Sequence, residues 1–460
     1  MRYRKDGCGR RSGGSGERRV ARRMLFPLAT SLLLLASCSV TKKISQSAKA
    51  DVLSNKAFVT AHTGISIYEP ATGKTWYDYQ GDKYFVPASN TKLPTCYAAM
   101  KYLGDSILSF FIKETEDSIN LIPAGDPSFL NSEFPEQDLF NYLKKSSKTI
   151  TVFFQSQNNV DAFGSGWSWN DYQEYYMAER SPMPVYGNVI TFQRKEKSIN
   201  VNPPIVLRKP YMDEPMMQLI GVGEKFKVTR SQDENKFSFA ADNNSFRTVQ
   251  IPYKTNRGIT NFNFLKDTLN NGDKTWLSLT RNTEGFKKVF SIPTDSLLKI
   301  TIHRSDNFFA EQCILMTSVR IFGYMDDDKT RDTLLKTDFK ELPQPPRWAD
   351  GSGLSRYNLF SPRDFVTILD KMRKDFGMNR MKVILATGGE GTISSYYKAD
   401  SGYIYGKTGT LSGVVAFSGY LYTKKGKLLI FSTLVNNHRA SATDIRRAIE
   451  KFLEGIRNKY

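Results

Sequence analysis

The sequence predicts a mixed α/β (α+β) fold in which an antiparallel sheet is flanked by helices and carries a β-rich insertion. Strand-like alternation around a turn at 64–79, and again at 414–435, supplies the predicted sheet. Apolar residues at helical spacing, at 89–103 and 442–459, supply flanking helices. Between the halves, residues 108–290 alternate short β-like runs with Asn, Asp and Gly turns, and this change of pattern predicts the insertion.

Length and composition limit the classes of protein. The chain has 460 residues, enough for two or three domains, and 40% hydrophobic with 13% aromatic residues exclude global disorder. The net charge is +19, of which the first 38 residues carry +7. Because no zinc-knuckle pattern and no concentrated basic stripe accompany this charge, we expect no nucleic-acid partner. A basic surface suits a polyanionic setting such as a cell envelope.

Residues 1–38 have the pattern of a lipoprotein signal segment. Four arginines precede an apolar run, Met24–Ala36, that is too short to span a membrane comfortably. The run ends in Leu35-Ala36-Ser37-Cys38, which resembles the bacterial lipobox, so we expect cleavage before Cys38 and lipid on that cysteine. The protein would then lie in the cell envelope or periplasm, with a lipid anchor as its only membrane attachment. An ordinary secretory signal is the alternative, and either Met1 or Met24 fits as the start.

The rest of the chain divides into a tether and two structural regions. Residues 39–55 are polar and rich in Lys, Ser and Ala, which predicts a flexible tether. The predicted catalytic domain is discontinuous and comprises 56–107 and 291–460, and the predicted accessory region comprises 108–290. The strands expected in that region are 150–154, 189–192, 225–228, 237–239 and 248–251.

In the second half of the predicted catalytic domain, Leu298–Ile302 reads as a β-like run and the residues from 308 to about 323 as a helix. Ser361 followed by Pro362 and Asp364 is typical of a helix start. The Lys407-Thr408-Gly409 stretch precedes the strand-like run 414–423. We expect this K-T-G strand to pair with 427–435 through the turn at 424–426.

Ser89 and Lys92 stand one helical turn apart at the start of the first predicted helix. Residues i and i+3 share a helix face, so the hydroxyl and the amine can meet. A serine hydroxyl needs a base within hydrogen-bond reach, and a lysine serves when its pKa is lowered. Alone, the S-x-x-K spacing is weak evidence, because an N-cap serine beside a solvated lysine also fits and the same spacing occurs elsewhere in the chain.

Two further motifs strengthen this interpretation. Ser305-Asp306-Asn307 and Lys407-Thr408-Gly409 each occur once and follow Ser89 in that order. A given tripeptide occurs by chance in about one chain in ten of this length. The ordered set S-x-x-K, S-D-N and K-T-G is therefore typical of a penicillin-recognising serine acyltransferase. Ser89 and Ser305 must touch one substrate although 216 positions separate them, and an inserted region accounts for that distance.

Cysteines and histidines offer little material for other chemistry. Cys8 and Cys38 lie in the signal segment, which leaves Cys96 and Cys313, each on the helix after a motif serine. Pairing of these two and a pair of buried free thiols both fit the sequence. With three histidines and no Cys/His cluster, we expect no metal site, no cofactor and no Ser-His-Asp triad.

The chain resembles the class C low-molecular-mass penicillin-binding proteins, the penicillin-binding protein 4 type of D-alanyl-D-alanine carboxypeptidase/endopeptidase. The likeness covers most of 60–455, and the long gap between the first two motifs separates this group from β-lactamases, where the gap is short. It rests on Pro87-Ala88-Ser89-Asn90-Thr91-Lys92-Leu93, Gly125-Asp126-Pro127, Gly166-Trp167-Ser168-Trp169, Ser305-Asp306-Asn307-Phe308-Phe309-Ala310-Glu311, Asp350-Gly351-Ser352-Gly353-Leu354-Ser355-Arg356 and Gly391-Thr392-Ile393. The resemblance implies the penicillin-binding-protein/β-lactamase-like transpeptidase fold and a serine-type peptidase of cell-wall peptidoglycan.

The resemblance also implies catalytic roles. Ser89 would be acylated by the penultimate D-Ala carbonyl of a peptidoglycan stem peptide, or by a β-lactam acting as a covalent inhibitor. Lys92 would take the proton from Ser89. Ser305 would pass a proton toward the leaving amine, and Asn307 would hold the substrate amide.

Substrate binding would fall to the K-T-G strand and three outlying residues. Lys407 and Thr408 would bind the terminal carboxylate, next to Gly409, and the backbone N–H groups of Ser89 and Thr410 would form the oxyanion hole. Several cations in one pocket would lower the pKa of Lys92. The candidates for a pocket that holds a diaminopimelate side chain are Trp167, Asp171 and Arg356, although this chain has Asn170 where the family usually has an acid.

Two other functions compete with a carboxypeptidase/endopeptidase. A class A β-lactamase needs a glutamate-containing loop between the second and third motifs, and the only near match, at 116–120, precedes the second motif. A non-catalytic lipoprotein or sensor with a penicillin-binding fold would not need all three motifs intact. The sequence therefore favours the peptidase and leaves the balance of carboxypeptidase and endopeptidase activity open.

Overall fold

The computed structural model describes residues 41–460 except 196–197, 204–216, 223–225 and 242–246. The predicted signal segment, 1–38, with its lipidation candidate Cys38, lies outside the described residues. Within the part that is described, no helix has the length and apolar character needed to cross a membrane.

The central sheet has six strands in the order β14-β15-β16-β17-β1-β2, all paired antiparallel. The predicted amino-terminal hairpin is present and adds to the carboxy-terminal strands, because β1 pairs with β17 from Tyr68↔Ile430 to His62↔Asn436. The strands are β14 (Ala386–Thr387), β15 (Ile404–Leu411), β16 (Val414–Tyr422), β17 (Leu428–Asn436), β1 (His62–Glu69) and β2 (Lys74–Tyr79).

The expected hairpin of 414–423 with 427–435 is confirmed as β16 and β17. The K-T-G stretch itself lies one strand earlier, inside β15, which pairs with β16 and was not predicted as a strand. Because glycine is uncommon in strands, Gly406 and Gly409 make the sequence of β15 look like that of a loop. They are needed because the strand is crowded: a Cβ on Gly406 would lie 2.6 Å from the carbonyl oxygen of Ser418.

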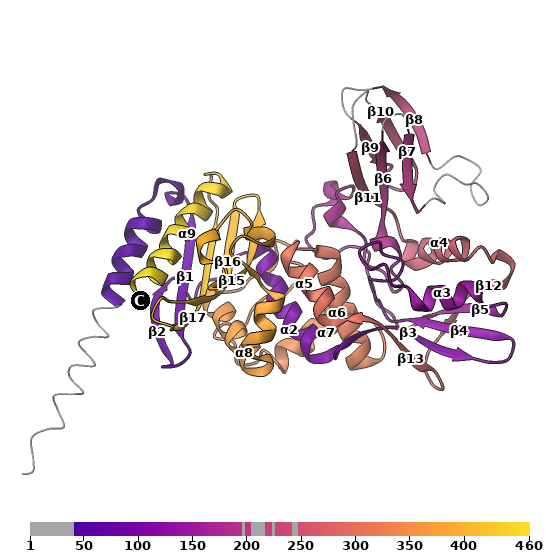
Figure 1. The fold of residues 1–460 in the computed structure, drawn as a ribbon, viewed down its shortest axis with the longest axis horizontal. Coiled ribbons are helices and arrows are strands. Elements are labelled where there is room, and N and C mark those ends of the chain that lie inside the picture. The colour runs from indigo at the N-terminus through magenta and orange to yellow at the C-terminus, as the bar shows by residue number, and fades with distance from the viewer. Residues whose placement is uncertain (1–40, 196–197, 204–216, 223–225, 242–246) are drawn as a thin grey trace, which may run out of the picture. The chain divides into compact units, whose positions relative to one another are not determined.

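Helices cover both faces of this sheet, which confirms the α/β fold class. Tyr420 of β16 faces α8 and donates a hydrogen bond to the Leu369 carbonyl at 2.7 Å. On the other side lies α9, drawn in yellow in Figure 1. Its Phe452 packs edge-on against Tyr77 of β2. The helices of this region are α2 (Lys92–Tyr102), α5 (Thr294–His303), α6 (Asn307–Phe322), α7 (Asp327–Lys336), α8 (Pro362–Ile384) and α9 (Ala442–Lys459).

Several of these helices begin and end as predicted. Ser361 caps α8 in a capping box with Asp364. Gly323, at φ +82°, ends α6. The run Leu298–Ile302 was wrongly expected to be a strand, since it lies inside α5 with Leu298 and Ile302 fully buried. A short apolar β-branched run does not distinguish a strand from a buried helix turn.

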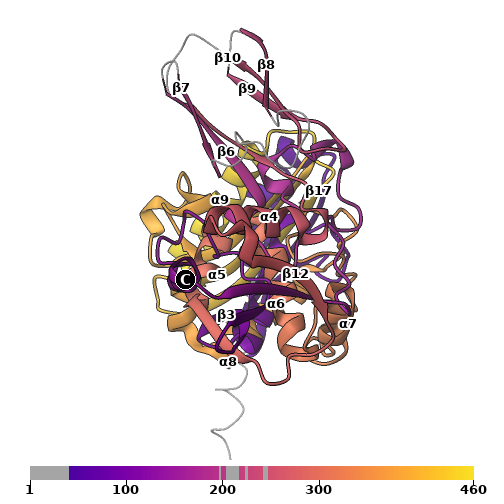
Figure 2. The same ribbon diagram turned by 90° about the vertical axis from the view of Figure 1, so that its right-hand side faces the viewer.

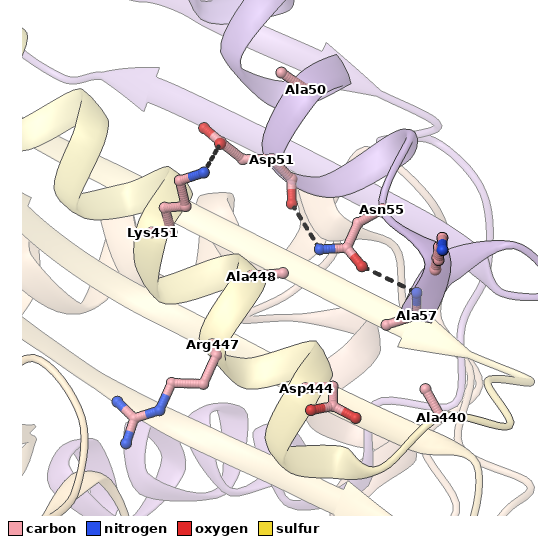
Figure 3. A pocket seen from close by; sticks show the side chains of 10 residues that line it. Ala50, Asp51, Asn55, Ala57, Ala440, Asp444, Arg447, Ala448 and Lys451 are labelled. Carbon is pink, nitrogen blue, oxygen red and sulfur yellow. Dashed lines mark hydrogen bonds and ion pairs between the residues drawn. The ribbon is translucent and has the colours of Figure 1, made fainter.

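The predicted tether is also corrected, because residues 44–48 are helical and continue as a π-helical turn, Lys49–Leu53. Ile44, Ala48 and Val52, four positions apart, are buried. Asp51 forms an ion pair with Lys451 of α9 at 3.0 Å, beside an open pocket of about 580 Å³ (Figure 3). The segment is polar overall, so its few apolar residues at helical spacing, Ile44, Ala48 and Val52, were not recognised as the buried face of a helix.

The region predicted as an insertion is β-rich, and each of its five predicted strands overlaps an observed one, although the strand predicted at 225–228 begins only at Lys227. A five-stranded sheet has the order β12-β5-β4-β3-β13, and two three-stranded sheets have the orders β11-β6-β7 and β8-β10-β9 (Figure 2). The strands are β3 (Ser106–Glu114), β4 (Ser118–Pro123), β5 (Thr149–Gln155), β6 (Val189–Lys195), β7 (Ser198–Asn202), β8 (Met217–Val222), β9 (Lys227–Arg230), β10 (Phe237–Ala241), β11 (Arg247–Pro252), β12 (Thr275–Thr280) and β13 (Lys287–Pro293).

Two helices in this region, α3 (Asp138–Lys145) and α4 (Ile259–Leu269), were not predicted. β3 begins and β13 ends within a few residues of the predicted limits, 108–290, and these two strands pair with each other. The chain therefore leaves and re-enters the helical region along neighbouring strands. The domain boundaries themselves stay predictions.

Candidate active site

Ser89 lies on a tight 3-10 turn, Ala88–Thr91, that leads directly into α2. Ala88 has φ +47°, a conformation that costs energy for a residue with a Cβ. The turn is held by Thr91 Oγ1, which donates to the Ala88 carbonyl at 2.9 Å, and by Asn90 Nδ2, which donates to Ser418 Oγ of β16 at 2.7 Å. Ser89 is therefore presented on a fixed backbone and is not the N-cap of α2.

Two glycines allow neighbouring segments to contact the backbone of this turn. A Cβ on Gly353, which has φ +83°, would lie 1.9 Å from the Ala88 carbonyl oxygen. A Cβ on Gly409 of β15 would lie 2.6 Å from the Pro87 carbonyl oxygen and 3.0 Å from the Ser89 nitrogen. Both positions require glycine, so the Gly-rich loop and the K-T-G strand pack directly on the Ala88–Thr91 turn.

Lys92 is fully buried, and its ammonium group has a hydrogen-bond acceptor for each of its three protons. Nζ donates to Ser89 Oγ at 3.1 Å, Asn307 Oδ1 at 2.7 Å and the Ser352 carbonyl at 2.7 Å. Burial lowers the pKa of Lys92 to about 8, against the opposing effect of nearby carboxylates, of which Asp350 acts most strongly. The expectation that neighbouring cations lower this pKa was wrong: desolvation does so.

Ser305 and Lys407 form a second hydroxyl–amine pair. Lys407 Nζ donates to Ser305 Oγ at 2.9 Å and to the Thr408 carbonyl at 2.6 Å. Burial, and then the charge of Lys92, holds the pKa of Lys407 well below its usual range. Ser305 has φ +61°, and Asp306 caps α6 by accepting from the Phe309 N–H at 2.8 Å. The cap fixes where Ser305 and Asn307 point.

Asn307 links the two halves of the site. Its Oδ1 accepts from Lys92, and its Nδ2 donates to the Tyr176 carbonyl at 3.2 Å. The S-D-N motif thus connects the Ser89–Lys92 pair to the segment around Tyr176, which the sequence assigned to the accessory region.

The threonines of β15 are two positions apart and therefore share one face of the strand. Thr408 Oγ1 donates to Thr392 Oγ1 at 2.7 Å. Thr410 Oγ1 accepts from the guanidinium of Arg446, on α9. Thr392 belongs to the Gly391-Thr392-Ile393 stretch, whereas no sequence signal pointed to Arg446.

The three outlying candidates contact different partners. Trp167 Nε1 donates to Asp350 Oδ2 at 2.8 Å, and Arg356 donates to the Ser412 carbonyl at 2.9 Å. Burial, together with Asp171, raises the pKa of Tyr176 to about 12. Trp167 therefore supports the Gly-rich loop, Arg356 joins that loop to the turn after β15, and Asp171 lies beside Tyr176.

The residues that sequence reasoning missed are mainly those that hold the Gly-rich loop. Asp350, fully buried, accepts from the Gly353 and Ser355 N–H groups at 2.8 and 2.6 Å. Glu311, also buried, accepts from the Ser352 N–H at 2.7 Å, and burial raises its pKa. Both acids stood in motifs that carried the family resemblance, but nothing in their spacing revealed these contacts.

The two remaining cysteines, Cys96 and Cys313, are free thiols and both are buried, which settles the pairing left open by the sequence. Burial raises the pKa of Cys96 to about 12, so the thiol stays neutral. Among the described residues, no cluster of His, Cys, Asp and Glu side chains could hold a metal ion.

Comparison with known sequences gives one family. The sequence signature of the D-Ala-D-Ala carboxypeptidase 3 (S13) family matches residues 46–258 and 278–456. Penicillin-sensitive carboxypeptidase A of Dictyostelium discoideum is 22% identical over 84% of this chain and 85% of its own length. D-alanyl-D-alanine carboxypeptidase DacB of Haemophilus influenzae is 23% identical over 83% of this chain and 87% of its own length.

Solved structures share the fold. Penicillin-binding protein 4 (dacB) from Haemophilus influenzae matches with a TM-score of 0.69 at 19% identity, over 90% of this chain and 98% of that chain. The Bd0816 predatory endopeptidase from Bdellovibrio bacteriovorus, in complex with immunity protein Bd3460, matches with a TM-score of 0.50 at 14% identity, over 86% of this chain and 94% of that chain. The resemblance to class C penicillin-binding proteins of the penicillin-binding protein 4 type is thereby confirmed, and the chain belongs to the D-Ala-D-Ala carboxypeptidase 3 (S13) family of serine peptidases.

Proposed function

We propose that this chain carries out the D-alanyl-D-alanine carboxypeptidase reaction of its family with Ser89 as the nucleophile and Lys92 as the general base. One observation carries the proposal: a buried lysine amine lies 3.1 Å from the Ser89 hydroxyl and has a pKa of about 8. Near pH 7.5 about a quarter of such a group is the neutral amine, which accepts the Ser89 proton as Oγ attacks the carbonyl carbon.

The second pair serves the leaving group. When the peptide bond breaks, the departing amine needs a proton. Ser305 Oγ passes its proton to the amine and takes one from the ammonium of Lys407, which donates to it at 2.9 Å. One N–H of Asn307 Nδ2 donates to the Tyr176 carbonyl, and the second N–H can donate to the substrate amide. The N–H groups of Ser89 and Thr410, brought together by the close packing of Gly409 on the turn, form the oxyanion hole.

The substrates are peptidoglycan stem peptides, with β-lactams as covalent inhibitors. The family description supports the first, and a β-lactam complex of the Haemophilus influenzae structure, matched at a TM-score of 0.64, supports the second. Cleavage of cross-links is the second candidate activity, because it is the same acyl transfer with a different leaving amine. Trp167, Asp171 and Arg356 remain proposed contacts for a diaminopimelate side chain.

Peptidoglycan lies in the cell envelope, and we place the protein there, in the periplasm, anchored through lipid on Cys38. A tether that is largely helical leaves few residues between the anchor and residue 44. The catalytic region would then work close to the membrane surface.

Labelling with a fluorescent penicillin tests the proposed nucleophile. The wild-type protein is expected to carry a covalent label, and Ser89→Ala is expected to carry none, because no acyl-enzyme forms without the hydroxyl. Rapid penicillin hydrolysis without a stable label would indicate a β-lactamase. A folded wild-type protein with neither label nor hydrolysis would indicate the non-catalytic alternative. A muropeptide assay then compares release of terminal D-Ala with cleavage of cross-links.

A further inference from the structure

Arg446 is a cation beside the K-T-G strand that the catalytic roles above leave unused. It lies near the start of α9, and its guanidinium donates to Thr410 Oγ1. Its Nε is shielded from solvent and has no hydrogen-bond partner. An arginine has five N–H donors in a planar fork, and apart from the shielded Nε–H and the one that Thr410 accepts, the donors on the terminal nitrogens remain for a ligand.

Lys407 of β15 and Arg446, which donates to Thr410 of the same strand, bring two basic side chains to this part of the site. Within the described residues, no ion pair involves Arg446 or Lys407. The charge of Arg446 also contributes to the low pKa of Lys407, after burial and the charge of Lys92. Lys92, by contrast, lies near three carboxylates. Paired cations without a counter-charge suit an anionic ligand.

We propose that Arg446 is a specificity-determining residue that binds the carboxylate next to the scissile bond of the substrate. This rests on the proposed function, and on the expectation from the family resemblance that the K-T-G strand, with Lys407 and Thr408, binds the substrate's terminal carboxylate. A guanidinium binds a carboxylate through two parallel hydrogen bonds, and the Thr410 hydroxyl already orients the group. The substrate class is then a peptide that ends in a free D-amino-acid carboxylate, in preference to its amide or ester.

The neighbouring arginine provides a matched control. Arg447 is the next residue on the helix, is exposed, and donates to Glu450 Oε2 at 2.5 Å and to the Ser395 carbonyl at 3.1 Å. Like Arg446, it also faces the ring of Tyr396. Its charge is balanced by that acid, so its removal takes one positive charge from α9 without touching the strand.

The test measures second-order acylation of Ser89 by benzylpenicillin and by its methyl ester, in wild type, Arg446→Gln, Arg446→Lys and Arg447→Gln. We expect Arg446→Gln to slow acylation by the acid about 10- to 100-fold, as for a lost hydrogen bond to a charged group, and to change the ester rate less than about twofold. Arg446→Lys should recover part of the preference for the acid, and Arg447→Gln should behave as wild type. A peptide ending in D-Ala-D-Ala, compared with its carboxamide, should show the same pattern.

Equal losses for acid and ester would overturn the inference, because they would mean that Arg446 only holds Thr410 and the oxyanion hole in place. An unchanged acid rate would also overturn it. If Arg446→Gln does not fold, as judged by thermal melting, Arg446→Met keeps the aliphatic stem and takes its place. A wild-type protein that neither penicillin nor the peptide acylates would instead refute the proposed function.

Discussion

Two serine–lysine pairs lie in one site, and they differ in what surrounds the amine. The ammonium of Lys92 meets three acceptors and lies near Asp350, Asp306 and Glu311, whose charges oppose the effect of burial. The ammonium of Lys407 meets two acceptors, Ser305 Oγ and the Thr408 carbonyl, and its charged neighbours are cations.

This difference suits the two serine–lysine pairs to different roles, proton transfer for one lysine and binding of an anionic group for the other. The carboxylates near Lys92 keep its pKa at about 8, where both the amine and the ammonium are populated near neutral pH, as a base that must give its proton back requires. Lys407 is also buried, but the charged side chains that lower its pKa are those of Lys92 and Arg446, both cations. Such a cluster of basic groups suits a site that binds an anionic substrate group. Three changes break or sharpen this contrast.

The largest effect is expected from Lys92→Met, which keeps the length of the side chain and removes the amine that we propose as the base. Acylation by benzylpenicillin should slow by about 10²- to 10⁴-fold, the usual contribution of a general base. Stopped-flow or quenched labelling over a range of penicillin concentrations measures the rate. Thermal melting checks that the variant is folded, since Asn307 Oδ1 and the Ser352 carbonyl lose a donor. A loss of only a few-fold would show that Lys92 is not the base.

A smaller effect is expected from Lys407→Met. The variant loses the donor to Ser305 and one cation for the substrate carboxylate, so acylation by benzylpenicillin should fall by about 10- to 100-fold. The comparison with Lys92→Met is the decisive measurement. If Lys407→Met proves the more damaging of the two, the roles assigned to the two lysines are reversed.

Much of the fold was predictable because short-range sequence patterns are enough to identify many of its elements. The hairpin of β1 and β2, the capping box of α8 and the apolar stripe of α9 each follow from short-range patterns. The failures share a cause. Leu298–Ile302, the helix at 44–53 and β15 itself were misjudged because packing by distant segments decides the structure of short or glycine-containing runs.

For the site, motifs located Ser89, Lys92, Ser305 and Lys407 but not the reason that the two lysines differ. That reason lies in Asp350 and Glu311, which reach Lys92 through the Gly-rich loop, and in Arg446, which comes from the last helix. A single sequence records none of these tertiary distances, so the contrast between the pairs becomes visible only in the folded chain.

The smallest effect, and the one that isolates the carboxylates, is expected from Glu311→Gln. The glutamine still accepts from the Ser352 N–H, whose own carbonyl accepts from Lys92, so the loop is kept while one negative charge is removed. That charge raises the pKa of Lys92, and its loss should lower the pKa from about 8 by less than about one unit. Because the neutral amine is the base, the rise of the acylation rate with pH should move to lower pH, and the rate at pH 7 should increase severalfold. Asp328→Asn, which removes an exposed acid whose side chain is 83% accessible, serves as the control and should leave the profile in place. A profile that stays where it is, or moves to higher pH, would mean that the carboxylates do not set the pKa of Lys92 and that burial alone distinguishes the two pairs.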